Sequence, residues 1–420
     1  MEDKQLPKNE FVREQIKEKP KNYKHIWMRL CTAALCGVVF ALALCFTLLF
    51  LMPMLHRQWE KSVVEEVTEG TQQPVATEET EATQVQESTQ IQVQKEPFSL
   101  KDYQKVQSEL YAIGNQANHS IVTITSVVSD TDWFNNPYER EGQGSGAIIG
   151  DKSGKLLILT EKKVIKNASE INVTFSNDVV APATLMKYDG NTGLAVLTVD
   201  KKDIEESALA SSKVIEMGSA NTVHKGSIVI ALGSPLGTND SILIGNITAT
   251  NNEISTLDSN YSVYTTDIVA NKNGSGILIN TDGELVGVVM QDYNTASSST
   301  LTAVGISELK PVMELLFADR NVPYVGVYAS TVTDKIAEKY GIPKGVYVKE
   351  VAMDSPAMDA GLQSGDVILK IAGEEVASVG AFSSVVLGLT PDESYQVIIM
   401  REGTGGYKKI SCEVKAGVLQ

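Results

Sequence analysis

The sequence predicts a mainly β protein in which two folded units follow a single transmembrane helix. Short β-branched runs alternate with Gly, Asn, Asp and Ser turns between residues 119 and 319, a spacing typical of barrels and sandwiches. A second strand-rich unit begins at Val322, and an uncharged apolar run precedes both units. At about 100–200 residues per domain, a chain of 420 residues has room for two or three domains.

The composition excludes several classes of function. The chain has 36 Lys and Arg against 52 Asp and Glu, and its net charge of −16 repels phosphate backbones, so we expect no nucleic-acid partner. Three of the four Cys lie in the apolar run and the four His are scattered, so we expect neither a disulfide framework nor a metal site. The Gly-rich stretches lack the Lys of a phosphate-binding loop, and we expect no cofactor.

The apolar run predicts one membrane span. It extends from Leu30 to Leu51 without a charged residue, long enough to cross a bilayer as a helix. Because it is apolar on every face, a span is favoured over a buried core helix. Residues 1–29 carry eight Lys or Arg and five acids, so the positive-inside rule makes them a cytoplasmic tail. We therefore expect a single-pass membrane protein with a helix over residues 30–52 and extracytoplasmic C-terminal domains.

Three further segments follow the span. Residues 53–98 are rich in Glu, Thr and Gln and predict a disordered acidic linker, because such a stretch buries too little apolar surface to offset its ordering entropy. Residues 99–319 form the first folded unit, which opens with an amphipathic helix over 99–117 capped by Ser99 and closes with a helix in "ISELKPVMELLFADRN". Residues 320–418 form the second unit.

The second unit resembles a PDZ domain. The stretch from Ser355 to Val376, "SPAMDAGLQSGDVILKIAGEEV", matches the pattern SPA-x-x-AGL-x-x-GD-x-I-x-x-I-x-G. The resemblance implies that this unit binds an extended peptide, often a free C-terminus, as an added strand.

The same resemblance assigns peptide-binding residues. It implies that backbone N–H groups of a short loop hold the peptide carboxylate, and here that loop is Tyr324, Val325, Gly326 and Val327. It also implies that a helix over residues 381–389 lines the side-chain pocket with Val385 and Val386; the alternative is that these two valines are ordinary core residues.

Residues 120–417 as a whole resemble the HtrA/Deg family of trypsin-like serine proteases. The resemblance implies a trypsin-like double β-barrel before the PDZ domain, peptide or unfolded-protein ligands, and a possible homotrimer. Five blocks carry it in the family's order: "GQGSGAIIGDKSGKLLILT", "NTGLAVLTVD", "KGSIVIALGSPLG", "YTTDIVANKNGSGILINTDGELVGVV" and "AVGISELKPVMELL".

The family's catalytic triad is incomplete at the matching positions. The His of the family's Leu-Thr-x-x-His-Val block falls on Lys163, and the Asp of its Thr-Asp-Leu-Ala-Val-Leu block falls on Gly193. The nucleophile falls on Ser275 when residues are counted from Asp267, and on Gly274 when they are counted back from Leu278. Because a Ser hydroxyl without a base is a weak nucleophile, we expect no trypsin-type catalysis.

Three functions remain open. The first is a proteolytically inactive HtrA-like protein that binds peptide C-termini or unfolded envelope proteins as chaperone, scaffold or regulator of protein quality control. The second is a serine endopeptidase in which Ser275 acts by a non-standard mechanism, for example with Lys163 as a neutral base. The third is a regulatory partner of an active HtrA paralogue, assembled through surfaces that include Tyr103 and Tyr111.

Overall fold

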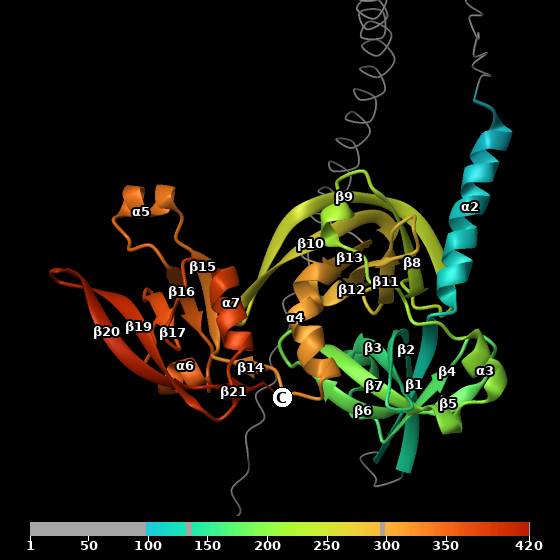
Figure 1. Cartoon of the computed structure of the whole chain (residues 1–420), viewed down its shortest axis with the longest axis horizontal. Helices are drawn as coiled ribbons and strands as arrows, with labels where there is room; N and C mark the ends of the chain where they lie inside the picture. The colour runs from blue at the N-terminus through green and yellow to red at the C-terminus, as the bar shows by residue number, and fades with distance from the viewer. Residues whose placement is uncertain (1–97, 132–136, 295–298, 420) are drawn as a thin grey trace, which may run out of the picture. The chain divides into compact units, whose positions relative to one another are not determined.

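The computed structural model describes residues 98–131, 137–294 and 299–419 (Figure 1). Residues 95–420 group into one compact unit. The predicted tail, the span from Leu30 to Leu51 and nearly all of the predicted linker lie outside the described residues. Within the described ranges, no helix has the length and apolarity that a bilayer crossing requires.

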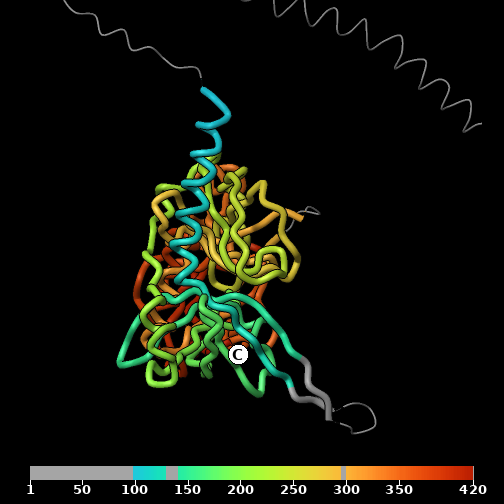
Figure 2. The backbone as a smooth tube through the Cα atoms, turned by 90° about the vertical axis from the view of Figure 1, so that its right-hand side faces the viewer, coloured from blue at the N-terminus to red at the C-terminus, as the bar shows by residue number. Residues whose placement is uncertain are grey.

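The first described element is helix α2 (Leu100–Asn118), which confirms the predicted amphipathic helix. It begins at Ser99 because the Ser99 hydroxyl accepts a hydrogen bond from the Asp102 N–H while the Asp102 carboxylate accepts one from the Ser99 N–H. Leu110, Gly114 and Ala117 are buried against the folded body. The N-terminal turns project away from it (Figure 2).

A seven-stranded antiparallel sheet follows α2, in the order β5-β4-β1-β2-β3-β7-β6. Its core consists of β-branched and Leu side chains from the inward face of each strand, among them Ile124, Ile158 and Leu197, which are fully buried. The strands are β1 (Ile121–Thr131), β2 (Pro137–Lys152), β3 (Lys155–Glu161), β4 (Glu170–Thr174), β5 (Val180–Pro182), β6 (Thr184–Tyr188) and β7 (Leu194–Asp200).

A closed six-stranded barrel forms the second half of the first folded unit, in agreement with the mainly β prediction, whereas the first half is an open seven-stranded sheet and not the second barrel that was predicted. Its two longest strands, β9 and β10, form a hairpin that extends from the barrel towards helix α7 (Figure 1). Helix α4 (Ile306–Phe317) then packs six buried side chains on the core. The barrel strands are β8 (Ile228–Ser234), β9 (Ser241–Thr256), β10 (Ser259–Val269), β11 (Ser275–Ile279), β12 (Leu285–Val289) and β13 (Thr300–Gly305).

The C-terminal unit has its own hydrophobic core around Phe382, Val346 and Ile371. Helix α7 (Val379–Leu387) starts two residues before the predicted 381–389, because the Ser378 side chain caps it. Helix α5 (Asp334–Tyr340) was not predicted; it buries no side chain, so no apolar periodicity marks it. The other elements are α6 (Pro356–Asp359), β14 (Pro323–Tyr324), β15 (Val327–Thr331), β16 (Val346–Val351), β17 (Val367–Ile371), β18 (Glu374–Glu375), β19 (Ser394–Gly403), β20 (Gly406–Lys415) and β21 (Gly417–Val418).

Candidate functional sites

The structure brings together the two positions that match the family's His and Asp. Strands β3 and β7 pair antiparallel with Glu161 opposite Leu194, and the chain then enters a short 3-10 helix over Lys162–Ile165. The Lys162 N–H donates to the Gly193 carbonyl at 2.7 Å. Lys163 and Gly193 therefore lie on neighbouring turns.

Lys163 is engaged by two carboxylates. Its Nζ lies 2.8 Å from Glu161 Oε2 and 3.7 Å from Asp292 Oδ2. Glu161 is 7% exposed, and its burial raises the pKa of the carboxyl to about 7, against the opposing effect of Lys163. A lysine held in this way has its Nζ directed at two acidic side chains and not at a serine. Sequence reasoning passed over Glu161, although an acid at the end of the apolar strand "LLILTE" signals a buried charge.

Ser275 is a buried residue of strand β11, where it pairs with Ser234 of β8. Its side chain is 2% exposed, and its Oγ accepts a hydrogen bond from the Ser145 N–H at 2.9 Å and lies 3.2 Å from Ser145 Oγ. At the alternative position, Gly274, an added Cβ would lie 2.3 Å from the Pro235 carbonyl oxygen. That position therefore has no room for a side chain.

In the part of the chain that the structure describes, Ser275 makes no hydrogen bond to a basic or acidic side chain. The polar contacts of Ser275 run to Ser145, and those of Lys163 run to Glu161 and Asp292. His119 and His224 are both exposed, at the end of α2 and in the turn before β8. Ser275 and Glu161 share a cavity of about 10 Å³, the space of roughly one water molecule.

The predicted carboxylate-binding loop of the C-terminal unit faces a carboxylate from the first unit. The Val325 N–H donates to Asp258 Oδ2 at 2.6 Å, and the Val327 N–H donates to Asp258 Oδ1 at 2.9 Å. The Gly326 N–H lies 2.9 Å from both oxygens. Burial raises the pKa of Asp258 to about 6, and the three N–H donors oppose that rise. Sequence reasoning missed Asp258, whose position in a hairpin turn is its one local signal.

Gly326 suits this loop because its φ is +100°, in the region that favours glycine, and an added Cβ would lie 2.4 Å from Ser355 Cβ. On α7, Val386 is 1% exposed within the core of the C-terminal unit, and Val385 is half-buried against that core. Both valines remain predicted pocket residues.

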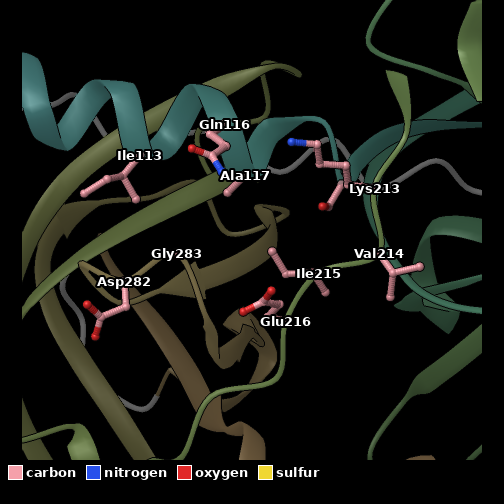
Figure 3. Close-up of a pocket in the computed structure, with 10 residues that line it drawn as sticks. Ile113, Gln116, Ala117, Lys213, Val214, Ile215, Glu216, Asp282 and Gly283 are labelled. Carbon is pink, nitrogen blue, oxygen red and sulfur yellow. The ribbon is translucent and has the colours of Figure 1, made fainter. Parts of the chain in front are cut away.

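A larger hollow of about 180 Å³ lies beside α2 (Figure 3). Its walls come from Ile113 and Ala117 of the helix, the segment from Lys213 to Glu216, and the turn at Asp282 and Gly283. It shares no lining residue with the Ser275 cavity. Among the described residues, no group of three His, Cys, Asp or Glu side chains is placed to hold a metal ion.

Comparison with known proteins agrees with both folded units. Residues 144–288 match the family model of the trypsin-like peptidase domain, and residues 323–414 match that of the PDZ domain. The chain is similar in sequence to proteases of the HtrA and DegP type. It is 28% identical over 321 residues to the serine protease Do-like HtrA of Bacillus subtilis (strain 168). The aligned region covers 71% of this chain and 68% of the B. subtilis protein.

Two further comparisons extend this relationship. A probable periplasmic serine endoprotease, DegP-like, of Marinomonas sp. (strain MWYL1) is 30% identical over 272 residues, 63% of this chain and 55% of that protein. The chain thus spans little more than half the length of that relative. The solved HtrA-type protease AlgW with decapeptide has the same fold, with a TM-score of 0.52, 22% identity and coverage of 74% of this chain and 98% of that one.

Proposed function

We propose that this HtrA/DegP relative is a membrane-anchored protein without trypsin-type protease activity. We further propose that its PDZ domain binds peptide C-termini or unfolded envelope proteins outside the cytoplasm, as a chaperone, scaffold or regulator of quality control. The observation that carries the proposal is the pairing of Lys163, at the position of the family's base, with Glu161 and Asp292.

The chemistry of acyl transfer supports the inactive assignment. A serine attacks a peptide carbonyl when a base within hydrogen-bond distance removes its proton, and an acid orients that base. Here the orienting position is Gly193, and the Ser275 Oγ accepts from a backbone N–H inside a cavity of about one water. Loss of triad members lowers kcat by several orders of magnitude in serine proteases.

The PDZ loop supports the binding assignment. Three consecutive backbone N–H groups, of Val325, Gly326 and Val327, converge on one carboxylate. Convergent N–H donors of this kind recognise the terminal carboxylate of a peptide, while the adjacent strand adds the peptide backbone. Strand β15, which follows the loop, is the edge strand of its sheet.

Two alternatives each have a supporting observation. The names of the B. subtilis and Marinomonas relatives describe proteases, which favours a serine endopeptidase that uses Ser275 by a non-standard mechanism. Tyr103 and Tyr111 of α2 are 51% and 45% exposed, which favours a surface for a homotrimer or for a mixed assembly with an active paralogue.

Casein hydrolysis tests the assignment. We expect the purified full chain in detergent micelles to cleave no more casein than its Ser275→Ala variant, because no base activates the serine. An active HtrA protease serves as the positive control, and the variant detects a contaminating protease. Cleavage by the parent that Ser275→Ala abolishes would overturn the inactive assignment and make Lys163 the next residue to substitute.

A further inference from the structure

The tip of the β9–β10 hairpin occupies the carboxylate-binding loop of the PDZ domain. We define the hairpin tip as Thr256, Leu257, Asp258 and Ser259. We propose that Asp258 is an internal ligand of this loop and that a peptide C-terminus binds the domain after the tip has left it. This inference rests on the proposed peptide-binding function and adds its regulation.

The contacts of Asp258 reproduce those of a bound peptide end. Its carboxylate accepts from the N–H groups of Val325, Gly326 and Val327, so these three donors are already occupied. Its own N–H donates to the Val327 carbonyl at 2.7 Å, the type of main-chain bond that an added strand makes. Because side chain and backbone both use the loop, a peptide and Asp258 exclude each other.

The burial of Asp258 shows why the contact is stable in spite of its charge. The residue is 4% exposed, and a carboxylate withdrawn from water is costly unless hydrogen bonds compensate for the lost hydration. The three N–H donors supply that compensation. Removal of the tip would in turn expose the same donors to solvent or to another anion.

Neighbouring contacts hold the hairpin tip in place. Ser259 Oγ lies 2.7 Å from Ser383 Oγ of helix α7, on the PDZ side. On the side of the first unit, Asn191 Oδ1 accepts from the Leu257 N–H at 3.1 Å, and Asn191 Nδ2 donates to the Leu257 carbonyl at 2.8 Å. The tip is thus presented in a fixed shape, which raises its effective concentration at the loop relative to a free peptide.

Amide hydrogen exchange of the full chain in detergent micelles tests the internal contact. Asp258 has a φ of +60°, so Asp258→Gly removes the carboxylate without straining the turn. We expect at least about tenfold faster exchange at Val325, Gly326 and Val327 in this variant. Asp178, an exposed turn residue with a φ of +63°, provides the matched control Asp178→Gly, which leaves these amides unchanged. Equal exchange in the parent and in Asp258→Gly overturns the inference.

A peptide pool then tests displacement. The probe is a fluorescent pool of decapeptides with an apolar last residue and a free carboxylate, and the same pool with amidated ends is the control. We expect Asp258→Gly and the isosteric Asp258→Asn to bind the free-acid pool at least about tenfold more tightly than the parent and Asp178→Gly do. In the parent, Asp258 occupies the loop and so lowers the fraction of molecules whose loop is free to bind a peptide.

The outcomes separate the two proposals. Equal binding of the free-acid pool by the parent and both Asp258 variants leaves the PDZ function standing and overturns displacement. Failure of every variant to bind either pool contradicts the proposed peptide binding, while faster exchange in Asp258→Gly still supports the internal contact. Thermal unfolding of each variant confirms that the protein compared is folded.

Discussion

Glu161 is an acidic residue whose proton binding is strongly altered by the fold. Its carboxyl is buried beside Lys163, and burial raises its pKa from 4.5 to about 7. The folded protein therefore holds this proton more tightly than the unfolded chain does, so the contribution to stability is fully present below about pH 4.5 and is lost as the pH rises through about 7.

This linkage predicts a pH-dependent effect of Glu161→Gln. The parent should lose on the order of 3 kcal/mol of unfolding free energy between pH 4.5 and pH 8 from this one group, and the variant should lack that loss. Urea unfolding of both proteins at the two pH values, followed by circular dichroism, measures the difference. Identical pH slopes in the parent and the variant would contradict the buried, proton-binding state of Glu161.

At the residue scale, sequence reasoning identified the positions that match the family's triad but not the side chains that contact them. The motif blocks matched Lys163 and Gly193 to the family's His and Asp, and the structure joins these two segments by the Lys162–Gly193 hydrogen bond. The partners of Lys163 were missed because they depend on side-chain direction: Glu161 is two residues away, and Asp292 is distant in the chain. No spacing rule in a single sequence reports such a pairing.

At the element scale, the PDZ motif contributes an acidic residue to a buried ion pair that the motif pattern alone does not predict. Asp366 precedes strand β17, is 1% exposed and forms a two-pronged ion pair with Arg401 of β19, with both nitrogen–oxygen distances below 3 Å. Arg401 Nη2 also donates to the Gly361 carbonyl at 2.8 Å. One guanidinium thus ties the turn after α6 to strand β19.

We expect Arg401→Met to destabilise the PDZ domain by about 3–5 kcal/mol, because it leaves the Asp366 carboxylate buried without its partner. Lys409→Met removes an exposed cation from the neighbouring strand β20 and should cost under about 1 kcal/mol. Urea unfolding followed by circular dichroism compares the two variants with the parent. Equal losses of unfolding free energy in the two variants would contradict a large contribution of the Arg401–Asp366 ion pair to stability.

The elements themselves were largely predictable because each has a local cause. Helices α2 and α4 follow apolar periodicity, and the strands follow β-branched runs between turns. Helix α5 and the contact of the β9–β10 hairpin with the PDZ loop were not predictable from the sequence. The first lacks a buried face, and the second joins residues 67 to 69 positions apart through a single carboxylate.

At the scale of residues 95–420, the hairpin links the two candidate sites. Its tip contacts the PDZ loop through Asp258 and the first unit through Asn191, which lies two residues before Gly193. A peptide that displaces the tip would therefore release a loop next to the position of the family's triad Asp.

The central claim is that Ser275 is not an activated nucleophile, and labelling with a phosphonate probe tests it most directly. Full-length protein in detergent micelles is incubated with the probe and its intact mass is measured, beside Ser275→Ala and an active HtrA protease. We predict that the active protease gains the mass of the probe and that the parent and Ser275→Ala do not. A mass gain in the parent that Ser275→Ala removes would contradict the account.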